Sequence, residues 1–167
     1  MELILSIMAA DRPGIVERIA DVVASHGGNW QESRLATMAG RFAGIIRVSL
    51  EQERYGELQT ALQALRDEGL NVQIEVGDSD AEAVESHWIE VIGNDRPGIV
   101  REVTRALAAE QVNVIDLATD VEPASMSGGL LFRAQLELGL TPGQSMDAVI
   151  QALEDLSPDL MVDRLND

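Results

Sequence analysis

"AADRPGIVERIADVV" (residues 9–23) and "GNDRPGIVREVTRAL" (residues 93–107) contain the same hexapeptide, DRPGIV, at a spacing of 84 positions. A repeat of this length indicates that one folding unit occurs twice in the chain. The register extends beyond the hexapeptide, because Asn29 and Asn113 are also 84 positions apart. The repeat therefore sets the domain organisation.

A looser match between 44–51 and 130–137 comes at 86 positions, which predicts a two-residue insertion in the loop 123–129. Each unit is about 75 residues long, the size of a small domain rather than of a solenoid repeat. The polar, acidic stretch between the units shows no hydrophobic periodicity and is typical of a linker. The predicted organisation is a domain at 1–77, an acidic linker at 78–85 and a second domain at 86–167.

The hydrophobic pattern of the first unit alternates between the strand period and the helix period. Pro13 suits the first turn of a helix, and Asp11 supplies a negative charge at the positive end of that helix. Gly40 marks a hairpin turn. The predicted strands are 3–9, 30–39, 41–50 and 70–76, and the predicted helices begin at Pro13 and run over 55–69.

The second unit repeats this order of elements. Strands are predicted at 87–93, 112–123, 130–138 and 160–165, and helices at 97–110 and 145–156. The order β-α-β-β-α-β is that of a ferredoxin-like sandwich, an α+β fold with a four-stranded antiparallel sheet and helices on one face. The sequence therefore predicts two such sandwiches in tandem, each with one uncovered sheet face that favours pairing.

Charge restricts the class of partner. The chain has 29 acidic and 12 basic residues, a net charge of −17, and every basic residue is arginine. A field of this sign repels phosphate backbones, so we expect no direct contact with nucleic acid. No apolar run reaches the roughly 18–20 residues that span a membrane, and the first residues lack a basic signal-peptide region. We expect a cytoplasmic protein.

Missing residue types exclude several chemistries. Without lysine there is no Schiff base and no P-loop lysine, and without cysteine there is no thiolate nucleophile and no cysteine-ligated zinc. His26 and His87 are two isolated histidines and do not make a zinc site. We therefore expect no metal and no cofactor.

The repeated hexapeptide opening a helix after a strand, with asparagine 18 positions after the aspartate in both copies, resembles the ACT domain family. That family consists of small amino-acid-sensing modules. The resemblance covers nearly the whole chain twice. The segment 31–44, "QESRLATMAGRFAG", further resembles the glycine cleavage system transcriptional repressor group, in which a tandem ACT protein restrains an activator of the glycine cleavage genes.

The resemblance implies an amino-acid site at each hexapeptide. A helix N-terminus presents unpaired N–H groups that accept a carboxylate, and a glycine there lets the ligand approach the backbone. The asparagine amide can bridge both ends of a zwitterion. The candidate ligand-binding residues are Asp11, Arg12, Pro13, Gly14, Ile15, Val16 and Asn29 in the first copy, and Asp95, Arg96, Pro97, Gly98, Ile99, Val100 and Asn113 in the second.

Each assignment has a structural alternative. Asp11 and Asp95 can serve as helix caps, and Asn29 and Asn113 can serve as left-handed turn residues. Some ACT domains have asparagine where this chain has Asp11 and Asp95, and some have histidine where it has Ala9 and Gly93.

Ferredoxin-like sandwiches also include acylphosphatase-type hydrolases, which use a loop arginine and an asparagine, and Arg12 with Asn29 would stand for that pair. The missing phosphate-binding loop and the negative charge argue against catalysis. We expect a non-enzymatic regulator, and a homo-oligomer, that responds to a small amino acid, glycine or serine by resemblance. It would act through a protein partner such as a transcriptional activator. The alternative is a free-standing regulatory subunit of a metabolic enzyme.

Overall fold

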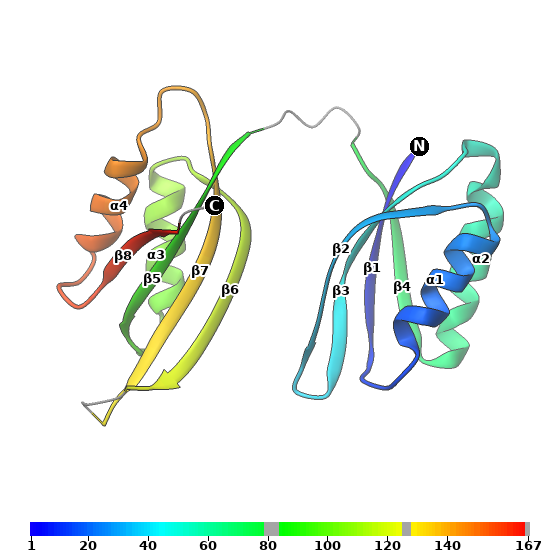
Figure 1. Cartoon of the computed structure of the whole chain (residues 1–167), viewed down its shortest axis with the longest axis horizontal. Helices are drawn as coiled ribbons and strands as arrows, with labels where there is room; N and C mark the ends of the chain where they lie inside the picture. The colour runs from blue at the N-terminus through cyan, green and yellow to red at the C-terminus, as the bar shows by residue number, and fades with distance from the viewer. Residues whose placement is uncertain (79–83, 125–127, 166–167) are drawn as a thin grey trace. The chain divides into compact units, whose positions relative to one another are not determined.

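The computed structural model describes residues 1–78, 84–124 and 128–165. Its contacts divide the chain into two compact units, Met1–Ala81 and Glu82–Asp167 (Figure 1). The acidic linker predicted at 78–85 lies mostly outside the described residues, as does the central part of the loop 123–129.

The first unit is a four-stranded antiparallel sheet in the order β2-β3-β1-β4. Its two α-helices lie on one side of the sheet (Figure 1). The predicted β-α-β-β-α-β order is confirmed, with α2 ending in a short 3₁₀ segment, η2. The elements are β1 (Glu2–Ala10), α1 (Ile15–Ser25), β2 (Asn29–Met38), β3 (Arg41–Ser49), η1 (Gln52–Arg54), α2 (Tyr55–Ala64), η2 (Leu65–Glu68) and β4 (Leu70–Val76).

The second unit has the same topology, with its strands in the order β6-β7-β5-β8 and its helices on one face (Figure 1). The prediction of two ferredoxin-like sandwiches is therefore confirmed. The elements are β5 (Glu85–Asn94), α3 (Ile99–Ala109), β6 (Asn113–Pro123), β7 (Leu130–Leu140), α4 (Met146–Glu154) and β8 (Met161–Leu165).

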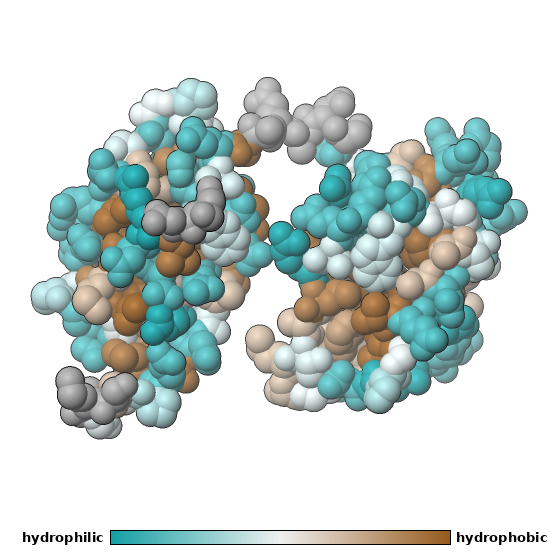
Figure 2. Space-filling view, viewed as in Figure 1, coloured by the Kyte–Doolittle hydropathy of each residue, from teal (hydrophilic) through white to brown (hydrophobic). Residues whose placement is uncertain are grey.

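Each unit has its own aliphatic core. Alternate residues of the central strand β1 point toward the helices, and α1 covers them with Ile15, Ile19, Val22 and Val23. In the second unit α3 covers β5 and β7 with Ile99, Val103 and Leu107. Neither buried cluster contains a residue of the other unit. Hydrophilic side chains cover most of the visible surface of each unit, and smaller hydrophobic patches are visible on each unit (Figure 2).

The helix starts differ from the sequence prediction. Pro13 was expected in the first turn, but α1 begins at Ile15 and α3 at Ile99. The reason is that Gly14 and Gly98 adopt left-handed conformations, with φ of 85° and 91°, which break the helix before them. The proline therefore belongs to the loop.

The second hairpin is longer than the repeat spacing predicts. Asn29 pairs with Ser49 across the first hairpin, 20 positions on, whereas Asn113 pairs with Gly139, 26 positions on. Ser49 and Gly139 occupy the same register beside the central strands, opposite Glu2 and Ser86. The equivalent spacing in this strand is therefore 90 rather than 86. The proposed two-residue insertion was wrong, because both spacings are even and preserve the same inward and outward alternation.

Leu62 of α2 is fully buried in the first core, so truncating it tests the packing of that unit. We expect Leu62→Ala to lower the free energy of unfolding by about 2–5 kcal/mol, through lost burial and a residual cavity. Val76, which is 64% exposed on β4, provides a matched aliphatic control. Val76→Ala should change stability by less than about 0.5 kcal/mol. Chemical denaturation measures both, and equal losses would contradict the core assignment.

Candidate functional site

The two DRPG loops connect a central strand to a helix in the same way in both units. The backbone N–H of Asp11 donates to the Gly40 carbonyl at 3.0 Å, and that of Asp95 donates to the Leu130 carbonyl at 2.9 Å. These bonds fix each loop to the hairpin of its own unit. Neither helix has a side-chain cap hydrogen bond, so the capping alternative for the two aspartates does not describe this geometry.

The glycine before each helix positions the first turn. Ile15 and Ile99 are buried directly behind it, while the next residues, Val16 and Val100, are 43% and 41% exposed. The first N–H groups of a helix have no intrahelical partner. The N–H of Ile99 donates to the Arg96 carbonyl at 3.3 Å, so in the second unit the donors at the helix start are the N–H groups that follow Ile99. This arrangement is able to bind an anionic group.

In the first unit the loop borders a shallow cavity of about 260 Å³. Its lining residues are Arg12, Pro13, Gly14, Glu17, Arg18, Asp21 and Glu68. Three predicted site residues therefore line one cavity, together with charged residues of α1 and η2 that the sequence analysis did not single out. Glu17, Arg18 and Asp21 lie within the five positions that follow the hexapeptide, which is the signal that would have found them, whereas no local signal marks Glu68.

Two of the lining residues form an ion pair. Arg18 Nη2 lies 2.6 Å from Glu68 Oε1, and Arg12 Nη2 donates to the Glu68 carbonyl at 2.9 Å. The hydrogen bond with Arg18 lowers the pKa of Glu68 and raises the pKa of Arg18. The guanidinium groups of Arg12 and Arg18 are thus both bound by Glu68 of η2.

The second unit arranges the same positions with the opposite charges. Glu102 stands where the first unit has Arg18, and it pairs with Arg96 at 2.6 Å. Arg101 stands where the first unit has Glu17. A Cβ placed on Gly98 would be 3.6 Å from the Arg101 guanidinium, whereas one on Gly14 would be 3.9 Å from the Glu17 carboxylate. Arg101 thus makes the second helix start more favourable to a carboxylate, whereas Glu17 makes the first less favourable to one.

The predicted asparagines lie far from the loops of their own units. Asn29 pairs with Ser49, and Ser49 pairs with Glu2 at the start of β1, whereas the loop follows Ala10 at the other end. Eight residue steps at about 3.3 Å each separate the two ends by about 26 Å. Asn113 has the same position relative to Ser86 in the second unit. A single unit therefore does not bring loop and asparagine together, and Arg12 with Asn29 does not form a hydrolase-like pair within it.

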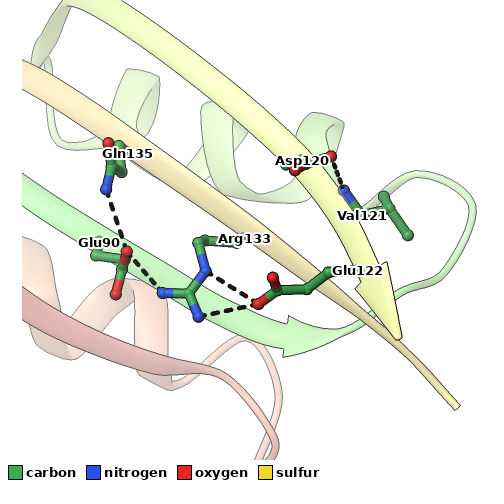
Figure 3. Close-up of polar contacts among 6 residues, drawn as sticks. All are labelled: Glu90, Asp120, Val121, Glu122, Arg133 and Gln135. Atoms are coloured by element: carbon green, nitrogen blue, oxygen red, sulfur yellow. Dashed lines mark hydrogen bonds and ion pairs between the residues drawn. The ribbon is translucent and has the colours of Figure 1, made fainter. Parts of the chain in front are cut away.

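A second polar cluster lies on the sheet face of the second unit (Figure 3). Arg133 of β7 contacts Glu90 of β5 at 2.8 Å and Glu122 of β6 at 3.0 Å. Gln135 also donates to Glu90, at 3.3 Å. The hydrogen bond from Arg133 lowers the pKa of Glu90. These ion pairs tie three strands together, and the sequence analysis missed them because their partners are distant in the chain.

Within the described ranges, no group of three metal-ligating side chains is present. None of the described helices is long and apolar enough to cross a membrane.

Profiles of the ACT domain match residues 2–77 and 87–133, which together make up well over half of the chain. The chain belongs to the ACT domain family and carries two ACT domains in tandem. The resemblance drawn from the repeated hexapeptide is confirmed.

The chain is 28% identical over 143 residues to the glycine cleavage system transcriptional repressor of Escherichia coli (strain K12), covering 83% of this chain and 73% of the relative. The Shigella flexneri repressor matches to the same extent. A Galdieria sulphuraria protein of unknown identity superposes with a TM-score of 0.78 and 26% identity, over 99% of this chain and 98% of that one. A protein provisionally assigned as a glycine cleavage system transcriptional repressor superposes with a TM-score of 0.73 over the same shares, and at 18% identity it shows the shared fold.

The ion pair between Glu90 and Arg133 predicts that the stability of the folded protein depends on pH. Because the pKa of Glu90 is lowered in the folded state, its ionised form contributes stability above the unfolded value of about 4.3, and this contribution is lost as pH falls through the folded pKa. We expect Glu90→Gln to remove that part of the acid sensitivity. Denaturant titrations across acidic pH would measure it, with Glu137→Gln on β7 as the control. If the free energy of unfolding falls equally with pH in the wild type and in Glu90→Gln, the prediction is contradicted.

Proposed function

We propose that this protein is an amino-acid-responsive regulator of glycine cleavage genes that acts through protein contact. The observation that carries the proposal is a pair of ACT domains, each with a DRPG loop, in a chain homologous to glycine cleavage system transcriptional repressors. No DNA-binding domain is indicated in the sequence, and a net charge of −17 opposes contact with phosphate backbones. The repressor would therefore act on a protein activator, in the cytoplasm, without catalysis.

The ligand of this regulator would be a small amino acid such as glycine or serine. The first-turn N–H groups after Gly14 or Gly98 would receive the carboxylate, with Arg101 adding a positive charge at the second site. Asp11 and Asp95, which the helix caps do not use, would accept hydrogen bonds from the ammonium group. Val16 and Val100 would contact the ligand beside the loop.

Asn29 and Asn113 require a second ACT unit in this proposal. Each lies about 26 Å from the loop of its own unit, by strand geometry, so the asparagine that completes a site belongs to another unit. Binding would then stabilise one pairing of units over another, because a ligand shifts an equilibrium only by its differential affinity for the two states. That shift is how a small ligand would change the surface offered to the activator.

Calorimetry tests the ligand site. Glycine has about five heavy atoms, and at about 1.5 kcal/mol per atom its affinity should be micromolar or weaker. We expect Asn29→Ala and Asn113→Ala each to weaken binding at the site it serves by about five- to 150-fold, through loss of a buried polar contact. Asn71→Ala, an exposed asparagine on β4, is the matched control and should bind as the wild type does. Binding of glycine and serine that is unchanged in both site variants would place the site elsewhere.

The partner is tested separately. We expect the purified protein to leave duplex DNA unshifted in a gel-shift assay at physiological salt, because the negative field opposes counterion release. The same assay with the activator of the glycine cleavage genes should show the protein joining or dissolving the activator–DNA complex. A specific shift by the protein alone would contradict the proposal. Affinity capture of a metabolic enzyme in place of the activator would favour the regulatory-subunit alternative.

A further inference from the structure

The outward faces of α1 and α3 are equivalent in shape and opposite in charge. On α1 the outward face, called here the acidic face, consists of Val16, Glu17, Ala20, Asp21 and Ala24. On α3 the residues 84 positions later form the basic face, Val100, Arg101, Thr104, Arg105 and Ala108. The apolar and small positions are retained between the two faces. The two exposed charged positions are both reversed, from Glu17 and Asp21 to Arg101 and Arg105.

The charged side chains of these two faces are free to contact a partner. All four are exposed, and in the described part of the chain none of them has an ion pair within 4 Å or a side-chain hydrogen bond. The neighbouring charges behave differently, since Arg18 is held by Glu68 and Glu102 by Arg96. A repeat that only needed a solvated helix face would not have to reverse both signs at the same two positions. Complementary charge is a device for selecting a partner.

We propose that the acidic face of α1 docks against the basic face of α3 in a second copy of this chain. An antiparallel crossing places Glu17 opposite Arg105 and Asp21 opposite Arg101. The small side chains of Ala20 and Thr104 lie at the crossing point and let the two helices approach closely. Two acidic faces, or two basic faces, would repel one another, so the charges select the α1–α3 combination.

A dimer satisfies both faces of both chains at once. Each chain carries one acidic and one basic face, so a twofold axis generates two identical α1–α3 contacts and leaves no face unpaired. Such an interface is closed and does not propagate into a filament.

The antiparallel crossing would also bring the DRPG loop of one chain closer to the predicted asparagine of the other. The N-terminus of α1, at Gly14, would lie beside the C-terminus of α3 in the partner, four residues before Asn113. This consequence rests on the proposed amino-acid site, whereas the dimer contact does not. A variant that fails to dimerise and a variant that dimerises without binding glycine are therefore distinguishable.

Sedimentation of the full chain at low salt tests the contact. We expect Glu17→Arg with Asp21→Arg, and separately Arg101→Glu with Arg105→Glu, to weaken dimerisation at least about tenfold, because like charges then face each other. The protein with all four substitutions should dimerise as the wild type does, and so should an equimolar mixture of the two double variants. The wild-type dimer should weaken as salt rises.

A matched control changes charge without touching either face. Glu57→Arg with Glu154→Arg makes the same change in net charge as the Glu17→Arg, Asp21→Arg variant, on exposed positions of α2 and α4, and should leave dimerisation unchanged. Equal weakening in this control, failure of the fourfold variant to recover, or a monomeric wild type would each overturn the proposal.

Crosslinking locates the contact directly, because the chain has no native cysteine. Chains carrying Ala20→Cys and differently tagged chains carrying Thr104→Cys, when mixed, should join through a short bis-maleimide in preference to pairs of like chains. A single chain carrying both cysteines should give crosslinked dimers. A linked monomer from that double variant would show that the two faces meet within one chain, and would overturn the assignment to a second copy.

Discussion

The structure of each unit depends on one interaction, the packing of an aliphatic helix face against the central strand of its sheet. Ile15 and Ile19 of α1 are almost fully buried against β1, and Ile99 and Val103 hold the same positions in α3. Burial of such side chains contributes about 1.5–3 kcal/mol each, so it fixes the helix position firmly. The left-handed glycine before the helix is the turn that allows this packing to begin directly after the strand.

Because the core fixes the helix, the opposite helix face has been able to change without loss of fold. The buried positions of α1 and α3 remain aliphatic, while exposed positions one residue away have reversed their charge. The same freedom explains the different partners of the loop arginines, since Arg12 contacts Glu68 and Arg96 contacts Glu102. Two domains of one fold thus present chemically distinct helix starts.

The fold followed from the sequence where the signal was local. The alternation in 70–76 and each copy of the hexapeptide are patterns within a short stretch of chain. The strand predicted from the first and the ACT resemblance drawn from the second are both confirmed. The helix start was misplaced by two residues because a proline in a loop and a proline in a first turn have the same sequence context. The hairpin register was wrong because spacings of 86 and 90 give the same inward pattern. The ion pairs of Arg133 join separate strands, and no local sequence pattern predicts them.

The distance between loop and asparagine gives the repeat a physical meaning. In a β-α-β unit the chain leaves the central strand at one end and returns through the helix to the other, so residues before and after the helix lie toward opposite ends of the sheet. No change of side chain within one unit can close that gap. A second helix lying antiparallel can, because its C-terminus comes beside the first helix's N-terminus. In the proposed dimer, two such units would supply the parts of a composite site, and the opposite helix charges would be the reason for unlike units to meet.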